Sequence, residues 1–169
     1  MMRKLHYIVL FLWLSTSALA EEIKGFWQTV DDRTKLPTSV IAVYPYEGKY
    51  YGRIIAIYDS EGHMVDSIYH PINRATAMVG DPFYCGLDIM FAASPKKDGL
   101  WKGHVLDPTN GNVYRAELKR KGNNLILRGK YLVFSKSVTW PPFPDNSFTL
   151  SFRKPDLSTF VPVKSVVKE

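Results

Sequence analysis

The feature that most constrains this chain is a pair of alternating segments joined by a short turn, within residues 101–119. Lys102 and His104 lie on one face of the first arm, opposite its apolar residues. The turn reads Asp-Pro-Thr-Asn-Gly, with a proline that sets φ and a glycine that tolerates positive φ. Alternation with a period of two on both sides of such a turn predicts a β-hairpin. The residues expected on its inner face are Trp101, Gly103, Val105, Tyr114, Ala116 and Leu118.

Most of the remaining chain repeats this pattern. Strands are predicted at 25–29, 39–46, 50–58, 87–91, 123–132 and 146–152, with a short one near Trp140. About eight short strands separated by turns indicate an all-β fold, and neighbouring strands joined by tight turns favour an antiparallel up-and-down barrel. Closing the barrel removes exposed sheet edges. Either the strand around Trp140 or the one at 146–152 closes it. The irregular segment 59–83 is expected to be a lid or binding loop.

The N-terminus is predicted to be a signal peptide. Arg3 and Lys4 precede an apolar run at 7–14, and Ala18-Leu19-Ala20 is a cleavage site of the small-x-small type. The apolar run is shorter than the roughly 20 residues that span a bilayer, so no transmembrane segment is expected. Cleavage after Ala20 would place the mature protein in the periplasm or outside the cell. We expect one barrel domain at 21–155 and a C-terminal tail at 156–169.

Charge and cysteine content narrow the possible partners. Removal of Arg3 and Lys4 lowers the formal net charge from +6 to +4, and the remaining basic residues are scattered, so nucleic acid is not an expected partner. Cys85 is the only cysteine, which excludes an internal disulfide framework and favours a buried thiol. His63 and His70 are seven residues apart, which is not a helical metal-pair spacing, and neither a metal nor a cofactor is expected.

Aromatic residues dominate the predicted inner face of the barrel. Such rings either fill the interior or line an apolar pocket whose hydroxyls orient a ligand, and the sequence leaves both alternatives open. The predicted ligand-binding residues are Trp27, Tyr50, Trp101, Tyr114, Tyr131, Phe148 and Phe152.

Four motifs together resemble the exported bacterial proteins grouped as domain of unknown function 2147. They are Gly-Phe-Trp at 25–27, Gly-Lys-Tyr-Tyr-Gly-Arg-Ile at 48–54, Gly-His-Val-Leu-Asp-Pro-Thr-Asn-Gly-Asn-Val-Tyr at 103–114 and Leu-Ile-Leu-Arg-Gly at 125–129. The resemblance implies a small periplasmic barrel of the lipocalin type and suggests a role with hydrophobic small molecules. In such barrels the Trp of the first strand closes one end beneath an arginine of a late strand. For Trp27 that arginine would be Arg153, with Arg128 as the other candidate. Relatives often carry paired cysteines where this chain has only Cys85.

Three classes of function follow. The first is a non-catalytic barrel that binds a small apolar ligand. The alternative is an envelope module with a fully packed barrel that binds proteins or polymers through Pro141–Pro144 and an outer basic face formed by Lys102, Arg115, Lys119, Arg128 and Lys130. The third, an enzyme, is not expected, because no nucleophile elbow, His-Glu-x-x-His motif or phosphate loop is present.

Overall fold

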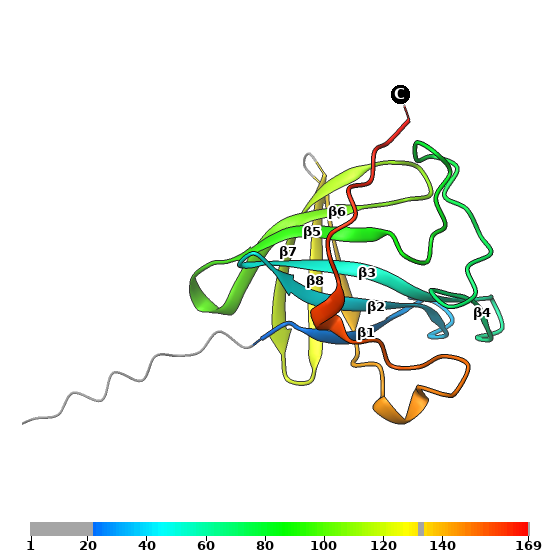
Figure 1. Ribbon diagram of the computed structural model, residues 1–169. Coiled ribbons are helices and arrows are strands. Elements are labelled where there is room, and N and C mark those ends of the chain that lie inside the picture. Colours follow the sequence, from blue (N-terminus) through cyan, green and yellow to red (C-terminus); the bar gives the residue numbers. More distant parts are fainter. Residues whose placement is uncertain (1–21, 132–133, 169) are drawn as a thin grey trace, which may run out of the picture.

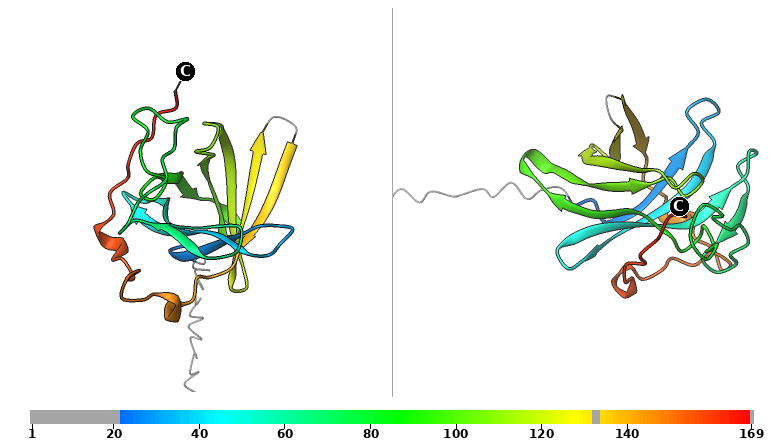
Figure 2. Two further views of the ribbon diagram at one scale, coloured as in Figure 1. Left: turned by 90° about the vertical axis from the view of Figure 1, so that its right-hand side faces the viewer. Right: turned by 90° about the horizontal axis from the view of Figure 1, so that it is seen from above.

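The computed structural model describes residues 22–131 and 134–168, so the predicted signal peptide lies outside it. Within these residues the chain is built from antiparallel strands that curve around a common interior (Figures 1 and 2). The strands are β1 (Gly25–Val30), β2 (Pro37–Tyr46), β3 (Lys49–Tyr58), β4 (Met64–Ser67), β5 (Asp88–Pro95), β6 (Leu100–Leu106), β7 (Val113–Lys121), β8 (Asn124–Tyr131) and β9 (Phe134–Trp140). The predicted all-β class and up-and-down antiparallel order are therefore confirmed.

The strands pair in the order β1-β2-β3-β5-β6-β7-β8-β9, and β4 pairs with β3 beside this path. The predicted hairpin is formed by β6 and β7. Their pairing is continuous, from Leu100 opposite Lys119 to Leu106 opposite Val113. At the tip, Asp107 accepts hydrogen bonds from the amide and hydroxyl groups of Thr109, and Gly111 has a φ of 76°. The turn chemistry thus acts as the sequence predicts.

The barrel is closed by the chain just after β9. Trp27 of β1 forms a bridge with Pro142, Gln28 N–H donates to Pro141 O at 2.8 Å, and Phe143 N–H donates to Phe26 O at 2.8 Å. Of the two late segments considered, the one around Trp140 therefore lies beside β1. The strand predicted at 146–152 is wrong: this stretch contains a short 3₁₀ turn, Asp145–Ser147, and no strand.

A bulge in β3, opposite the step from Val40 to Ile41 in β2, changes which residues of β3 point inward. Tyr50 and Ile54, which alternate with Gly52 on one face of the first part of β3, contribute to the interior cluster. Beyond the bulge, Ala56 belongs to the outer cluster while Ile57 packs inward. A single extra residue reverses the alternation, which explains why apolar residues occur on both faces of this strand.

The described residues pack into one apolar cluster inside the barrel and a second one outside it. The inner cluster includes Trp27, Trp101 and Trp140. The outer cluster covers the exterior of β1, β2 and β3 with Phe143, Phe152 and other side chains from the C-terminal segment, which we define as residues 141–168. This segment runs along the outside of the barrel (Figure 2).

The C-terminal segment ends on the long connection between β3 and β5, residues 59–87. Val79 N–H donates to Val166 O at 2.8 Å, and Lys168 N–H donates to Ala77 O at 3.0 Å. Beneath this contact, Met78 and Leu106 belong to a third small apolar cluster. Residues 156–168, the described part of the predicted tail, therefore lie against the rest of the fold rather than extending into solvent.

Candidate functional site

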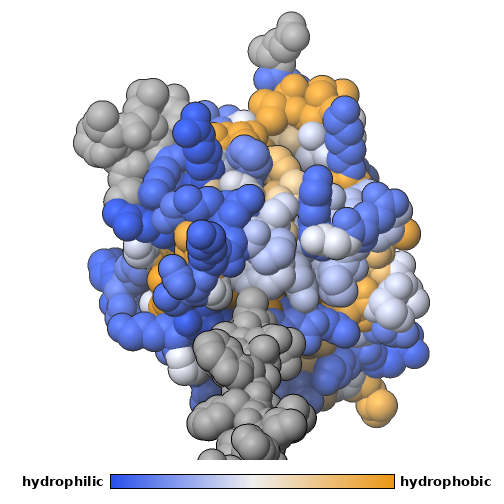
Figure 3. All heavy atoms as spheres, turned by 90° about the vertical axis from the view of Figure 1, so that its left-hand side faces the viewer, coloured by the Kyte–Doolittle hydropathy of each residue, from blue (hydrophilic) through white to orange (hydrophobic). Residues whose placement is uncertain are grey.

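One end of the barrel interior is closed by aromatic side chains. This closed end carries the β2–β3, β5–β6 and β7–β8 turns. Trp27 is buried, and its Nε1–H donates to Ile23 O at 2.9 Å. The rings of Tyr50 and Trp101 meet edge to face with centroids 4.7 Å apart, which is a favourable aromatic geometry. Viewed from outside, the face at this end is mostly hydrophilic (Figure 3).

Two polar groups at the closed end differ in how well they are satisfied. The Tyr50 hydroxyl donates to Glu22 Oε1 at 3.1 Å, and burial, followed by this carboxylate, raises the pKa of Tyr50 to about 12. The indole Nε1–H of Trp101 is buried and has no acceptor among the described residues. Because an unsatisfied buried donor costs about 1–3 kcal/mol, an acceptor atom placed beside the Trp101 N–H group would stabilise it.

The arginine that stacks on Trp27 is Arg120, whose guanidinium carbon lies 4.9 Å from the indole centroid. Arg153 instead lies over Tyr69 at 5.6 Å, so the pairing of Arg153 with Trp27 is wrong. The reason is that residues 146–152 pack outside the barrel rather than forming its last strand. The alternation of β7 could have identified Arg120, since it falls on the same face as Ala116 and Leu118.

Toward the opposite end, where the 59–87 connection lies, several inward apolar residues are only partly buried. Ile68 from this connection packs against the inner cluster, and buried Cys85 belongs to it. The partly exposed residues that pack on the inner cluster are Ile57, Ile68, Ile89, Val105 and Val138. We call this region the open half. Apolar side chains that contact the core and are also reached by solvent can contact an apolar ligand.

The seven residues predicted to bind ligand do not form one set. Trp27, Tyr50 and Trp101 lie in the packed closed end. Tyr114 pairs with Val105 and is partly buried at the open half. The side chain of Tyr131 lies outside the described part of the structure.

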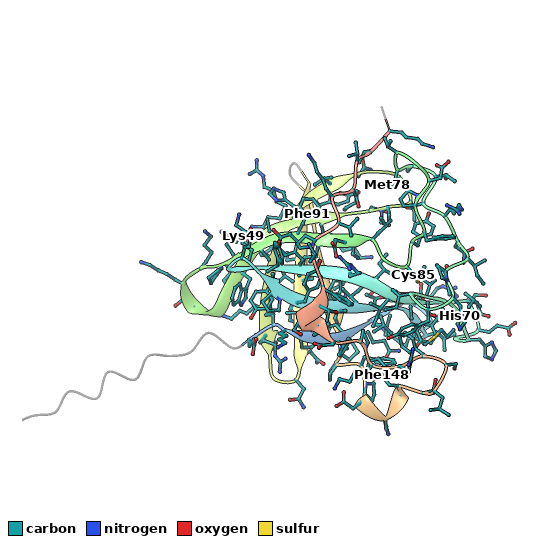
Figure 4. All side chains as sticks on the ribbon, in the orientation of Figure 1. Lys49, His70, Met78, Cys85, Phe91 and Phe148 are labelled. Atoms are coloured by element: carbon teal, nitrogen blue, oxygen red, sulfur yellow. The ribbon has the colours of Figure 1, made fainter. Side chains whose placement is uncertain are left out.

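Phe148 and Phe152 belong to the outer cluster, where their rings stack 5.4 Å apart, so the structure excludes them from the interior. Figure 4 shows Phe148 on the C-terminal segment, away from the inside of the barrel. Phe148 and Phe152 pack on the outer wall, whereas Leu150 between them is 97% exposed, so the alternating residues of 146–152 do not share one buried face.

A buried ionic network on the outer face was not predicted from the sequence. Asp88 is 2% exposed and accepts hydrogen bonds from Tyr44 Oη at 2.9 Å, Arg53 Nη2 at 2.9 Å and Val163 N–H at 2.6 Å. Arg53 Nη2 also donates to Val161 O at 2.6 Å. Burial opposes the charge on Arg53, but the hydrogen bond and charge of Asp88 outweigh it and raise the pKa of Arg53. The network therefore fastens the C-terminal segment to β2, β3 and β5.

Cys85 and Asp66 form a second buried polar pair in the 59–87 connection. Burial, followed by the charge and hydrogen bond of Asp66, raises the pKa of the Cys85 thiol. Asp66 also accepts hydrogen bonds from the amides of Ile72 and Asn73. The predicted burial of Cys85 is confirmed, and a protonated buried thiol is a poor nucleophile.

A hollow of about 740 Å³ lies outside the closed end, between β1 and the C-terminal segment. Lys24, Arg120, Asp145 and Asp156 are among its lining residues. This mixed charge fits an apolar molecule poorly. No group of three or more His, Cys, Asp or Glu side chains in the described residues is arranged to hold a metal ion. Within 22–131 and 134–168, no helix has the length and hydropathy needed to cross a membrane.

Comparisons with known proteins agree with this geometry. A solved structure described as "Protein HP1028 from the human pathogen Helicobacter pylori belongs to the lipocalin family" is similar to this fold with a TM-score of 0.59. It is 17% identical in sequence, and the match covers 74% of this chain and 85% of the other. At this identity the likeness shows the fold alone. No curated protein matches the sequence.

The sequence itself carries the assignment to a family. Residues 25–141 match the family model described as "Uncharacterized protein conserved in bacteria (DUF2147)". This range begins with β1 and ends where the chain after β9 returns to β1, so the match spans the whole barrel. The C-terminal segment beyond Pro141 lies outside the matched range. The chain belongs to the DUF2147 family, and its barrel is lipocalin-like.

Proposed function

We propose that this protein is an exported, non-catalytic carrier or sensor that binds a small apolar molecule in the open half of its barrel. The observation that carries the proposal is the contrast between the two ends of the interior. The closed end is packed with aromatic rings, whereas apolar side chains of the open half contact the core and remain partly exposed. The lipocalin-like fold supports this interpretation as an analogy, since a fold does not by itself imply a function.

The position of the 59–87 connection supports a gating role. Ile68 packs against both the inner and the outer clusters. A ligand that enters beside Ile68 would exchange water for contact with side chains such as Val105 and Val138. Burial of apolar surface stabilises a complex by roughly 25 cal/mol per Å² before the costs of association. Movement of this connection would then control entry.

Binding is tested by titrating the purified mature chain with cis-parinaric acid, a fluorescent fatty acid, and by native mass spectrometry of protein purified without detergent. Val138 and Thr139 are neighbours on β9, one packed on the inner cluster and the other exposed. Val138→Gln is expected to weaken binding at least about fivefold because it places an amide among apolar contacts. Thr139→Gln is the matched control and should bind like the wild type.

Val105→Gln is a second interior variant, to be used if Val138→Gln does not fold. Thermal melting shows whether each variant is folded. Absence of saturable binding by folded wild-type protein, together with a bare mass, would overturn the ligand proposal and favour the envelope interaction module. Export is tested separately by fractionating bacteria that express the full chain and sequencing the N-terminus. Mature protein beginning at Glu21 in the periplasmic fraction is expected, and uncleaved cytoplasmic protein would contradict export.

A further inference from the structure

The outer wall of the barrel is covered unevenly. The C-terminal segment buries the exterior of β1, β2 and β3 and is tied to Asp88 at the start of β5. The exterior between β5 and β8 instead carries an open groove of about 450 Å³. Its charged or titratable lining residues are Lys96, Lys102, His104, Arg115, Glu117 and Lys130. This groove lies on the outside of the sheet and is separate from the proposed ligand site in the interior.

The floor of the groove is shaped by a bulge and a glycine. The pairing of β5 with β6 shifts between Phe91 and Ser94, and Ala92 within this step has a φ of 56°. Opposite the bulge, a Cβ on Gly103 would lie 2.8 Å from Ala93 Cα and 2.8 Å from Phe91 O. Only a glycine permits such a close approach of two backbones. The hollow is therefore a built feature of the wall.

The charges around the groove are unbalanced. Glu117 Oε1 is shared by Lys130 Nζ at 2.9 Å and Lys102 Nζ at 3.3 Å, and these lysines lower the pKa of Glu117. The side chains of Lys96 and Arg115 have no hydrogen-bond or ion-pair partner among the described residues. Four cations and one carboxylate leave a formal surplus of three positive charges, with His104 counted as neutral.

The arrangement of the cations suits a compact anion. Arg115 lies opposite His104 on β6 and opposite Lys130 on β8. Neighbouring strands are about 4.8 Å apart, so cationic side chains on three adjacent strands can converge on one group. A guanidinium binds a phosphate or carboxylate through two parallel hydrogen bonds, and lysines add point charges.

We propose that this groove, which we call the anion groove, binds an oxyanion, namely a phosphate or carboxylate group. The group would be carried either by a free small molecule or by a lipid headgroup. Arg115 and Lys96 supply the uncompensated charge, while Glu117 holds Lys102 and Lys130 in place between strands. This site is independent of the apolar interior, so its failure would leave the proposed function untouched.

The first test is a titration of the ¹⁵N-labelled mature chain with inorganic phosphate, monitored through the amide chemical shifts in NMR spectra. Saturable shifts are expected at Gly103 and Ala116, and they should weaken as ionic strength rises. The double variant Lys96→Gln/Arg115→Gln should bind phosphate at least about tenfold more weakly. The matched control, Lys49→Gln/Lys121→Gln, removes the same charge from exposed positions outside the groove and should bind like the wild type.

The source of the anion is distinguished by sedimentation with vesicles. Cosedimentation with vesicles of one part phosphatidylglycerol and three parts phosphatidylethanolamine, lost in the Lys96/Arg115 variant but not in the control, would assign a lipid headgroup. Saturable phosphate binding without cosedimentation would assign a free small molecule. Absence of saturable shifts in the wild type, or equal weakening in both double variants, would overturn the proposal, because only general electrostatic attraction would remain.

Discussion

Individual residues set the shape of the barrel wall, and two glycines in it have very different surroundings. Gly103 and Gly129 both lie inside strands, on β6 and β8, at positions that alternation assigns to the inner face. A Cβ on Gly103 would contact the backbone of β5 at 2.8–2.9 Å, whereas nothing lies within 4 Å of a Cβ on Gly129. The two glycines look alike in the sequence. Only the neighbouring strand makes the first one obligatory.

We expect Gly103→Ala to lower the free energy of unfolding by about 1–3 kcal/mol, because backbone atoms of β5 cannot move aside as a flexible side chain can. Gly129→Ala should stay within about 1 kcal/mol of the wild type, since it adds no clash and reduces the entropy of the unfolded chain. Urea unfolding monitored by tryptophan fluorescence measures both. Equal stability of the two variants would contradict the close approach of β5 and β6.

At the scale of elements, the C-terminal segment is held by an ionic network as well as by apolar packing. Asp88 on β5 connects Arg53 and Tyr44 with the backbone of Val163. A second kind of ion pair, Glu117 with Lys102 and Lys130, bridges strands on the exposed wall. Buried and exposed pairs differ in energy because a buried charge that loses its partner keeps its desolvation cost.

Asp88→Ala should therefore lower the free energy of unfolding by about 3–5 kcal/mol. Glu117→Gln, the exposed counterpart, should cost less than about 1 kcal/mol. Hydrogen exchange gives a local readout, because the amide of Val163 loses its acceptor in Asp88→Ala and should lose protection before the interior strands do. Unchanged protection of Val163 in that variant would show that apolar contacts alone hold the segment.

At the scale of the whole molecule, stability depends on groups that are buried in their protonated form. Burial, followed by other causes, raises the pKa of Cys85, Tyr44 and Tyr50, the last to about 12. A group that binds its proton more tightly when folded stabilises the fold fully below its unfolded pKa. That contribution is lost as the pH rises through its folded pKa.

We therefore expect stability to fall as the pH rises from about 9, where an unfolded thiol titrates, through about 12 for Tyr50. Urea midpoints at pH 7 and pH 11 measure the loss. Tyr50→Phe should lose less stability over this interval than the wild type does, because it has no phenol to ionise. An identical loss in both proteins would place the alkaline sensitivity elsewhere.

The sequence by itself determined the class, the meander and the β6–β7 hairpin, because alternation and turn chemistry act between neighbours along the chain. The same local rule assigned Trp101 and Val105 to the inner face correctly. It failed at 146–152, where alternating Phe148 and Phe152 belong to a segment that packs on the outer wall. An apolar stripe requires burial, but it does not specify which of two apolar surfaces will provide it.

Only the tertiary structure decided the contacts that depend on distant parts of the chain. Arg120 rather than Arg153 stacks on Trp27 because the chain after Trp140 closes the barrel. Asp88 acquires its partners from residues 44, 53 and 163. The division of the interior into a packed closed end and a partly exposed open half is likewise a property of the assembled barrel. Local patterns predict which residues will be buried, and long-range packing determines which surface buries them.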